Sequence, residues 1–153
     1  MTLLENFTPL LKAASGVDLS DPAAARRELE SRFDPHGEEG QALTKQLQGL
    51  LAEGRICENG EMPVKWGRVT KATEESLGFS IDVVHMNGAG PRHRHPKGEV
   101  NFCVPLDGTP AFEEQTVGWV VMAPDSVHVP KVDGGEMLIV YLLPGGEMEF
   151  IKG

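Results

Sequence analysis

The spacing of hydrophobic residues predicts three helices in the first third of the chain. Apolar side chains recur every three or four positions, which gathers them on one face of a helix. Asp21 before Pro22 is typical of a helix start, and Gly16 and Gly54 follow runs where a helix is expected to end. The expected helices cover residues 3–14, 22–33 and 38–53. None carries a cluster of reactive side chains, so we expect the helices to cover a sheet or to form a dimer contact.

From about residue 62 the apolar period changes to two, which is the spacing of strands with one buried face. We expect strands at residues 62–71, 78–86, 93–95, 99–104, 118–123, 136–143 and 147–151. Turn-forming sequences separate them, among them Asp107-Gly108 and Asp133-Gly134-Gly135. Several short strands without intervening helices predict an antiparallel sandwich or a small barrel.

Length and charge narrow the function classes. The 153 residues fit one domain, or one domain with an appendage. A net charge of -9 argues against nucleic acid or an anionic membrane as partner, because such binding needs a basic face. No apolar run approaches the roughly 20 residues that span a bilayer, and the first residues lack the basic region of a signal peptide. Two cysteines are too few for a disulfide framework, so we expect a cytoplasmic protein.

The candidate chemistry lies in the strand-rich part, which holds four of the five histidines. His93, His95 and Glu99 form the pattern His-x-His-x3-Glu. Residues two apart on a strand point to the same face about 7 Å apart, so both imidazoles can approach one ion. The Pro-Lys-Gly sequence between His95 and Glu99 can turn the carboxylate toward the same point. Further along, the strand at 118–123 leads into a turn that presents His128.

Three imidazoles and one carboxylate suit one divalent transition metal (Fe, Mn, Zn, Ni, Co or Cu), with one or two positions left for water or substrate. We therefore expect the metal ligands His93, His95, Glu99 and His128, with the first three as the catalytic residues. The alternative is a polar pocket without metal, in which Glu99 and the histidines act directly as acids and bases.

Two stretches, residues 88–108 and 118–128, resemble the two motifs of the cupin superfamily, whose members are small jelly-roll barrels with a metal inside. The resemblance covers roughly the last 90 residues and implies the same four metal ligands. Ser126 stands where the second motif usually has glycine, and His128 comes one residue early after Pro124. We expect a mainly β, single-domain cupin over residues 56–153 with an α-helical N-terminal extension over residues 1–55.

A helical third joined to a single cupin, with the stretch Pro-Arg-His-Arg-His-Pro-Lys-Gly-Glu-Val-Asn, resembles the bacterial 4-hydroxylaminobenzoate lyase family. This resemblance implies a lyase that converts 4-hydroxylaminobenzoate and water to 3,4-dihydroxybenzoate and ammonia, with a small aromatic carboxylate as its partner. The alternatives are a cupin dioxygenase or isomerase acting on a small organic acid, or a cupin that binds a ligand or metal without turnover. A DNA-reading sensor is disfavoured because the helical third is acidic rather than basic.

We expect further side chains to line the site beside the four candidate ligands. Asn101 and Cys103 alternate with their neighbours so that they point the same way as Glu99. Asn101 either hydrogen-bonds a substrate heteroatom or is a polar neighbour of the ligands, and Cys103 is interpreted as a small buried residue rather than a nucleophile. Arg68 shares a strand face with Trp66, which places a guanidinium beside an aromatic ring, as a benzoate would require. The alternative for Trp66 is a place in the core.

Two more residues are candidate substrate contacts. Tyr141 lies in a strongly apolar strand where its hydroxyl needs a partner, so it either lines the pocket or is a satisfied core tyrosine. His85 ends a strand just before a glycine-rich loop, where it is either a base behind the site or a histidine at the rim. Open edge strands and amphipathic helices favour pairing, so we expect a homodimer.

Overall fold

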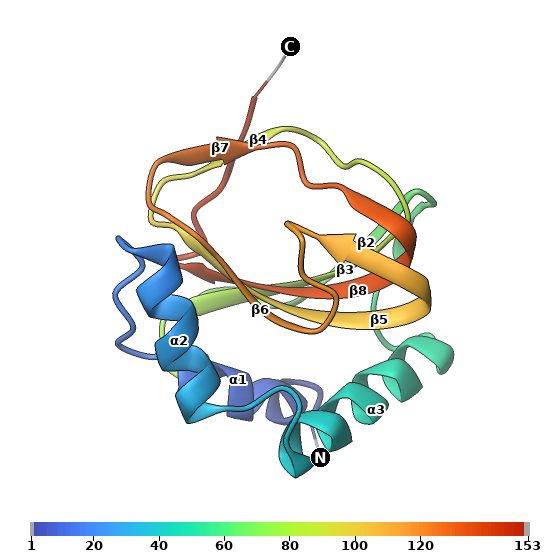
Figure 1. The fold of residues 1–153 in the computed structure, drawn as a ribbon, viewed down its shortest axis with the longest axis horizontal. Coiled ribbons are helices and arrows are strands. Elements are labelled where there is room, and N and C mark those ends of the chain that lie inside the picture. Colours follow the sequence, from blue (N-terminus) through green and yellow to red (C-terminus); the bar gives the residue numbers. More distant parts are fainter. Residues whose placement is uncertain (1, 152–153) are drawn as a thin grey trace.

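In the computed structural model, which describes residues 2–151, the strands form two antiparallel sheets that face each other (Figure 1). In chain order the elements are η1 (Leu4–Phe7), α1 (Thr8–Ala14), α2 (Pro22–Arg32), α3 (Glu38–Ala52), β1 (Asn59–Glu61), β2 (Val64–Thr70), β3 (Phe79–Met86), β4 (His93–His95), β5 (Glu99–Phe112), β6 (Gly118–Met122), β7 (Ser126–His128), β8 (Val132–Pro144) and β9 (Glu149–Phe150). The larger sheet has the order β1-β2-β3-β8-β5-β6, and the smaller has the order β7-β4-β9. This confirms the mainly β fold with an α-helical N-terminal extension, and the two facing sheets fit a cupin jelly roll.

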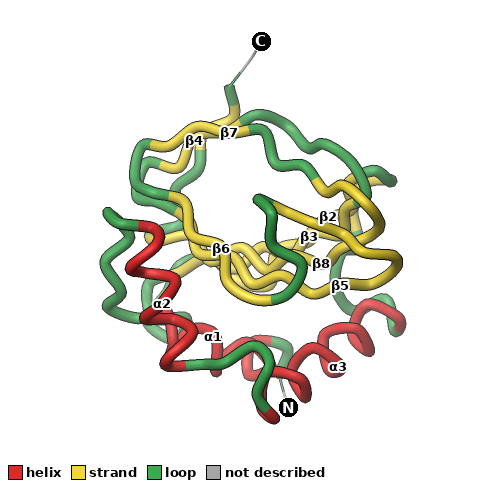
Figure 2. The backbone as a smooth tube through the Cα atoms, viewed as in Figure 1, coloured by secondary structure: helices red, strands yellow, loops and turns green. Residues whose placement is uncertain are grey.

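The helices begin and end close to the expected residues. The Asp21 side chain accepts a hydrogen bond from the backbone N–H of Ala24 and so caps α2. The first expected helix is divided into the 3-10 turn η1 and α1, because Pro9 lacks an N–H and fits only the first turn of an α-helix. All three α-helices lie on one side of the larger sheet (Figure 2). No helix within residues 2–151 is both long enough and apolar enough to span a bilayer.

The larger sheet is apolar on both faces, and its outer face packs against the helices. Phe33, at the end of α2, meets the rings of Phe102 and Trp119 edge-on, with centroids 5.9 and 6.3 Å away. The indole N–H of Trp119 donates a hydrogen bond to the Phe33 carbonyl at 2.9 Å. These contacts join α2 to β5 and β6, so the helical extension and the strands share one core.

The inner face of the larger sheet forms a second, smaller apolar cluster that lines the space between the sheets. Its buried members are Val84, Met86, Cys103, Phe112, Val120, Val132, Met137, Ile139 and Tyr141. Val100, Phe102 and Val104 belong instead to the outer core. The alternation expected along β5 is therefore confirmed, and it places Glu99, Asn101 and Cys103 on the inner face.

Two expected turns, Asp107-Gly108 and Asp133-Gly134-Gly135, lie inside paired strands, so their assignment as turns was wrong. β5 and β8 pair continuously past them, with register shifts between Pro105 and Asp107 and between Gly108 and Ala111. Glycine at positive φ serves β-bulges as well as turns, and Gly108 has a φ of 73°. Both strands are consequently longer than expected. β1 and β7 are additional, and the other expected strands are confirmed within their ranges.

We expect Phe33→Ala to lower the free energy of unfolding by about 3–5 kcal/mol, because it leaves a cavity between α2 and the sheet. Chemical denaturation followed by circular dichroism measures the change. Arg27→Ala, at an exposed position of the same helix, is the control and should change stability by less than about 0.5 kcal/mol. A Phe33→Ala protein as stable as the control would show that α2 does not share the core of the sheet.

Candidate metal centre

Four side chains from three strands converge between the two sheets. His93 and His95 lie on β4, Glu99 begins β5, and His128 ends β7. β4 and β7 are paired with His93 opposite His128, which puts both rings on the same face. Gly98, at a φ of 88°, makes the turn that returns Glu99 toward β4, and a Cβ there would lie 2.9 Å from the Met122 carbonyl oxygen. The structure thus brings together all four residues expected to bind a metal, with ligand atoms within 4.8 Å of one another.

The three imidazole Nε2 atoms surround one carboxylate oxygen. Glu99 Oε2 lies 3.5 Å from His93 Nε2 and 3.8 Å from His128 Nε2, and it is in closer contact with His95 Nε2. The Nε2 atoms of His93 and His128 are only 3.2 Å apart. His93, His95 and Glu99 are buried, whereas the His128 side chain keeps 10% of its surface exposed. His128 is therefore the member of the cluster on the solvent side.

Each imidazole also makes a hydrogen bond at Nδ1, the ring nitrogen that points away from the centre of the cluster. The acceptors are the Pro91 carbonyl for His93 at 3.2 Å, the Ser126 hydroxyl for His95 at 3.0 Å and the Glu113 carboxylate for His128 at 3.0 Å. The Ser126 hydroxyl donates its own proton to the Ala123 carbonyl at 2.6 Å, so it accepts from His95. A carbonyl and a carboxylate can only accept, and these partners therefore assign the proton of each neutral ring to Nδ1.

The centre of the cluster is consequently surrounded by electron-pair donors. Three Nε2 atoms and a carboxylate oxygen face one another, and Glu99 Oε1 is buried without a hydrogen-bond partner in residues 2–151. Burial opposes ionisation of Glu99, but the adjacent His93 and His95 outweigh it and hold the pKa of this carboxyl well below its ordinary value. Three nitrogens and one anionic oxygen fit a divalent transition metal, which accepts electron pairs from all four.

Two expected substrate contacts lie on the inner face beside the cluster. Asn101 is fully buried, and neither its amide oxygen nor its amide nitrogen has a partner in the described part of the chain. Tyr141 is the register partner of Asn101, and its hydroxyl reaches only the Met86 sulfur at 3.9 Å, a weak acceptor. Both polar groups therefore lie among the buried apolar side chains of the inner face with unused hydrogen-bonding capacity.

Arg68 and Trp66 lie on the inner side of β2, opposite Asp82 and Val84 of β3. The Arg68 guanidinium donates two hydrogen bonds to the Asp82 carboxylate, at 3.0 and 3.3 Å. Trp66 is 50% exposed, so it is not a core residue. The pair thus lies on β2, three strands away from β5, rather than beside the four-residue cluster.

The structure does not bring His85 to the cluster. His85 alternates with Val84 and Met86, which belong to the apolar cluster of the inner face, so its ring lies on the opposite side of β3. There its Nε2 pairs with a Glu136 carboxylate oxygen at 2.9 Å. The expectation that His85 contacts substrate is corrected accordingly, because the sequence alone placed it near the loop without fixing its side.

Two residues that hold the histidines were not among the expected site residues. Glu113 lies in a turn that carries no motif and meets His128 only through folding. Ser126 left a signal in the sequence, since it replaces the usual glycine of the second cupin motif, and its hydroxyl is the partner of His95. Serine in place of the usual glycine was therefore the sequence signal for the hydrogen bond to His95.

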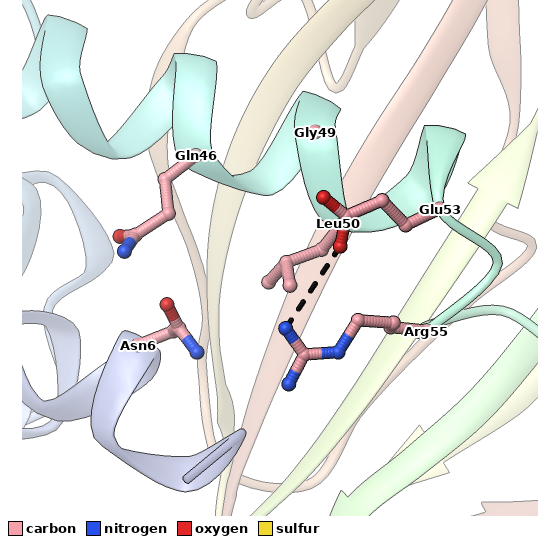
Figure 3. A pocket seen from close by; sticks show the side chains of 6 residues that line it. All are labelled: Asn6, Gln46, Gly49, Leu50, Glu53 and Arg55. Atoms are coloured by element: carbon pink, nitrogen blue, oxygen red, sulfur yellow. Dashed lines mark ion pairs between the residues drawn. The ribbon is translucent and has the colours of Figure 1, made fainter. Parts of the chain in front are cut away.

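Two surface clefts lie away from the cluster. A cleft of about 370 Å³ between η1 and α3 is lined by Asn6, Gln46, Gly49, Leu50, Glu53 and Arg55 (Figure 3). A neighbouring cleft of about 230 Å³ also includes Arg55 and is bordered by Arg68. Neither contains a member of the four-residue cluster, and the Arg55–Glu53 ion pair in the first is a loose contact of 3.9 Å.

Comparisons with known proteins agree with the sequence motifs. A family model described as PnbB, 4-hydroxylaminobenzoate lyase, matches residues 12–150. A 4-hydroxylaminobenzoate lyase from Pseudomonas putida is 28% identical over 152 residues, covering 87% of this chain and 86% of that protein. One from Nocardioides sp. (strain LMS-CY) is 33% identical over 91 residues, or 54% of each chain. Among solved structures, an RmlC-like cupin protein from Ralstonia eutropha JMP134 has a TM-score of 0.46 at 16% identity, covering 63% of this chain and 65% of that one.

We expect both cysteines to be unreactive in the folded protein. Burial raises the pKa of Cys57 to about 12, and burial together with the negative charge of Glu99 raises the pKa of Cys103 further still. An aromatic disulfide reagent at about pH 8 should detect no thiol in the native state and two thiols in guanidinium. Rapid labelling of Cys103 in the native protein would instead make it a candidate nucleophile.

Proposed function

Since the chain belongs to the 4-hydroxylaminobenzoate lyase family, we propose that it converts 4-hydroxylaminobenzoate and water into 3,4-dihydroxybenzoate and ammonia at one divalent transition metal. The metal ligands in this proposal are His93, His95, Glu99 and His128. The reaction is redox-neutral: the N–O and C–N bonds break, two C–O bonds form at ring positions 3 and 4, and the nitrogen leaves as ammonia. The two hydroxyl oxygens balance the hydroxylamine oxygen and the one water consumed. The observation that carries the proposal is the convergence of three imidazole Nε2 atoms on one buried carboxylate.

The four ligands and their supports prepare the centre before substrate arrives. A bound metal supplies a Lewis acid for the departing hydroxyl oxygen or for the attacking water. The Nδ1 hydrogen bonds of His93, His95 and His128 orient each ring so that its Nε2 points to the centre of the cluster. The low pKa of Glu99 means that its carboxyl is already ionised.

The apolar inner face suits the aromatic ring of the substrate. Burial of a planar ring against aliphatic and sulfur-containing side chains excludes water from the reacting carbon. Asn101 lies two residues beyond Glu99 on the same face, and its unpaired amide can both donate to and accept from the hydroxylamino group. Burial raises the pKa of Tyr141, which keeps the phenol proton in place for donation to the substrate.

A polar row leads from the cluster to the open edge of the sheet. Asn101, Tyr141, Asp82 and Arg68 are successive register partners across β5, β8, β3 and β2. β2 lies three strand spacings, or roughly 14 Å, from β5, and the Arg68 and Asp82 side chains meet on the inner face between them. A para-substituted benzoate bound at Arg68 would extend along this row toward Asn101. Asp82 uses two of the five N–H donors of Arg68, which leaves donors for the substrate carboxylate.

We also propose that the protein acts as a homodimer in the cytoplasm. β1 and β6 are the edge strands of the larger sheet, and open edges favour pairing with another chain. Light scattering tests the dimer, since a monomeric mass at working concentration contradicts it.

Metal removal and restoration test the centre. We expect ammonia release from 4-hydroxylaminobenzoate to disappear after chelation and to return with one metal equivalent per chain. His93→Ala and His95→Ala should each lower kcat/KM at least about 100-fold, because each removes a ligand. His36→Ala changes an exposed histidine between α2 and α3 and should leave activity unchanged. Full turnover by the chelated protein would favour direct acid–base action by Glu99 and the histidines over metal chemistry.

The proposed carboxylate anchor has its own test. Arg68→Gln should raise KM for 4-hydroxylaminobenzoate about 10-fold or more with little change in kcat, because it removes binding that is present before and during the reaction. The matched substrate is the uncharged 4-hydroxylaminobenzamide, whose KM should not respond to the substitution. An equal rise in KM for acid and amide would assign Arg68 a structural role, through Asp82, in place of carboxylate binding.

A further inference from the structure

The turn that follows β5 contains an unusual pair of residues. Phe112 and Gln115 exchange two backbone hydrogen bonds, each of 2.9 Å, around the two central residues Glu113 and Glu114. These have φ values of 48° and 67°, the left-handed region. A two-residue turn with both central residues at positive φ favours Asn and Gly, because a longer side chain is strained there. The sequence has glutamate at both positions.

Only the first of these glutamates contacts the candidate metal centre. Glu113 Oε1 accepts the hydrogen bond from His128 Nδ1 at 3.0 Å. Within residues 2–151, the side chain of Glu114 makes no hydrogen bond or ion pair. The two residues therefore share the same turn and the same strained backbone region but differ in their relation to His128.

We propose that Glu113 is a positioning residue, which holds His128 in the tautomer and ring orientation that direct Nε2 to the metal. This inference rests on the metal-dependent function proposed above. His93 and His95 are buried and are held by a neighbouring carbonyl and hydroxyl, whereas His128 is partly exposed and could otherwise exchange its Nδ1 partner for water. A carboxylate at this distance also increases the electron density that the imidazole offers to a cation.

Both central residues of the turn have the left-handed backbone, so the contact with His128, and not the strain alone, distinguishes Glu113 from Glu114. If the turn mattered only for the fold, Asn or Gly would serve it better than glutamate. The carboxylate at 113 is the feature that those residues would not supply at the same reach.

Two matched substitutions separate the carboxylate from the turn. Glu113→Asn and Glu114→Asn both place a residue that tolerates positive φ in the same turn, so each should leave Tm unchanged or raise it by about 2–4 °C. Titration of the metal-free proteins with Co²⁺, followed by visible absorption, measures metal affinity. We expect Glu113→Asn to weaken Co²⁺ binding about 10-fold or more, Glu114→Asn to bind as the wild type does, and Glu113→Gln, which keeps an acceptor oxygen at full length, to fall between them.

The outcomes distinguish this inference from the proposed function. Equal Co²⁺ affinities for Glu113→Asn and the wild type, or equal losses in both Asn variants, overturn the role of Glu113 while leaving the metal centre intact. Failure of the wild type to bind Co²⁺ refutes the metal centre itself. Imidazole ¹⁵N shifts of the metal-free protein then still decide the inference: His128 should carry its proton on Nδ1 in the wild type and lose this preference in Glu113→Asn. A wild-type His128 protonated on Nε2 overturns it.

Discussion

Three imidazoles and an ionised carboxylate that share one buried space need positive charge among them, from a bound metal ion or from a proton on a ring. That constraint explains why each Nδ1 has its own acceptor, since a ring free to rotate or change tautomer would turn a proton toward the centre. It also explains why the supports come from three different places in the chain. The antiparallel pairing of β4 with β7 and the turn at Gly98 bring these groups together, and the remaining structure keeps them in place.

The outer face of the larger sheet contributes mainly to stability, and its inner face carries candidate site residues. The outer face meets the helices in an extensive apolar core, whereas the inner face carries Glu99 and Asn101 among hydrophobic neighbours. A buried amide without partners costs about 1–3 kcal/mol, which the outer core must offset. The helical extension thus serves the site indirectly, because packing at Phe33 stabilises β5, whose other side carries Glu99.

Periodicity was sufficient to predict most helices and strands. It also predicted which side chains of β5 point inward, because side chains alternate along a strand and one inward residue fixes the direction of the others. Contacts between strands could not be predicted in the same way. The pairing of Arg68 with Asp82 and the position of His85 depend on register, which the sequence leaves open. Glycine at positive φ is equally compatible with a turn and a bulge, so the extension of β5 past Gly108 was missed. The division of the chain at residue 55 stays a prediction, since the helices and strands share a core.

The two departures from the cupin motif, Ser126 in place of glycine and His128 one residue early, both lie in β7 and have one structural explanation. In β7, Ser126 and His128 are the register partners of His95 and His93, so both face the cluster, while Val127 between them is exposed. Moving the histidine by one residue would send its ring to solvent, because strand side chains alternate. The ligand is therefore selected by its register against β4 rather than by its distance from Pro124. Ser126, on the same inward side, then stands where its hydroxyl can hold His95, a contact that glycine would not provide.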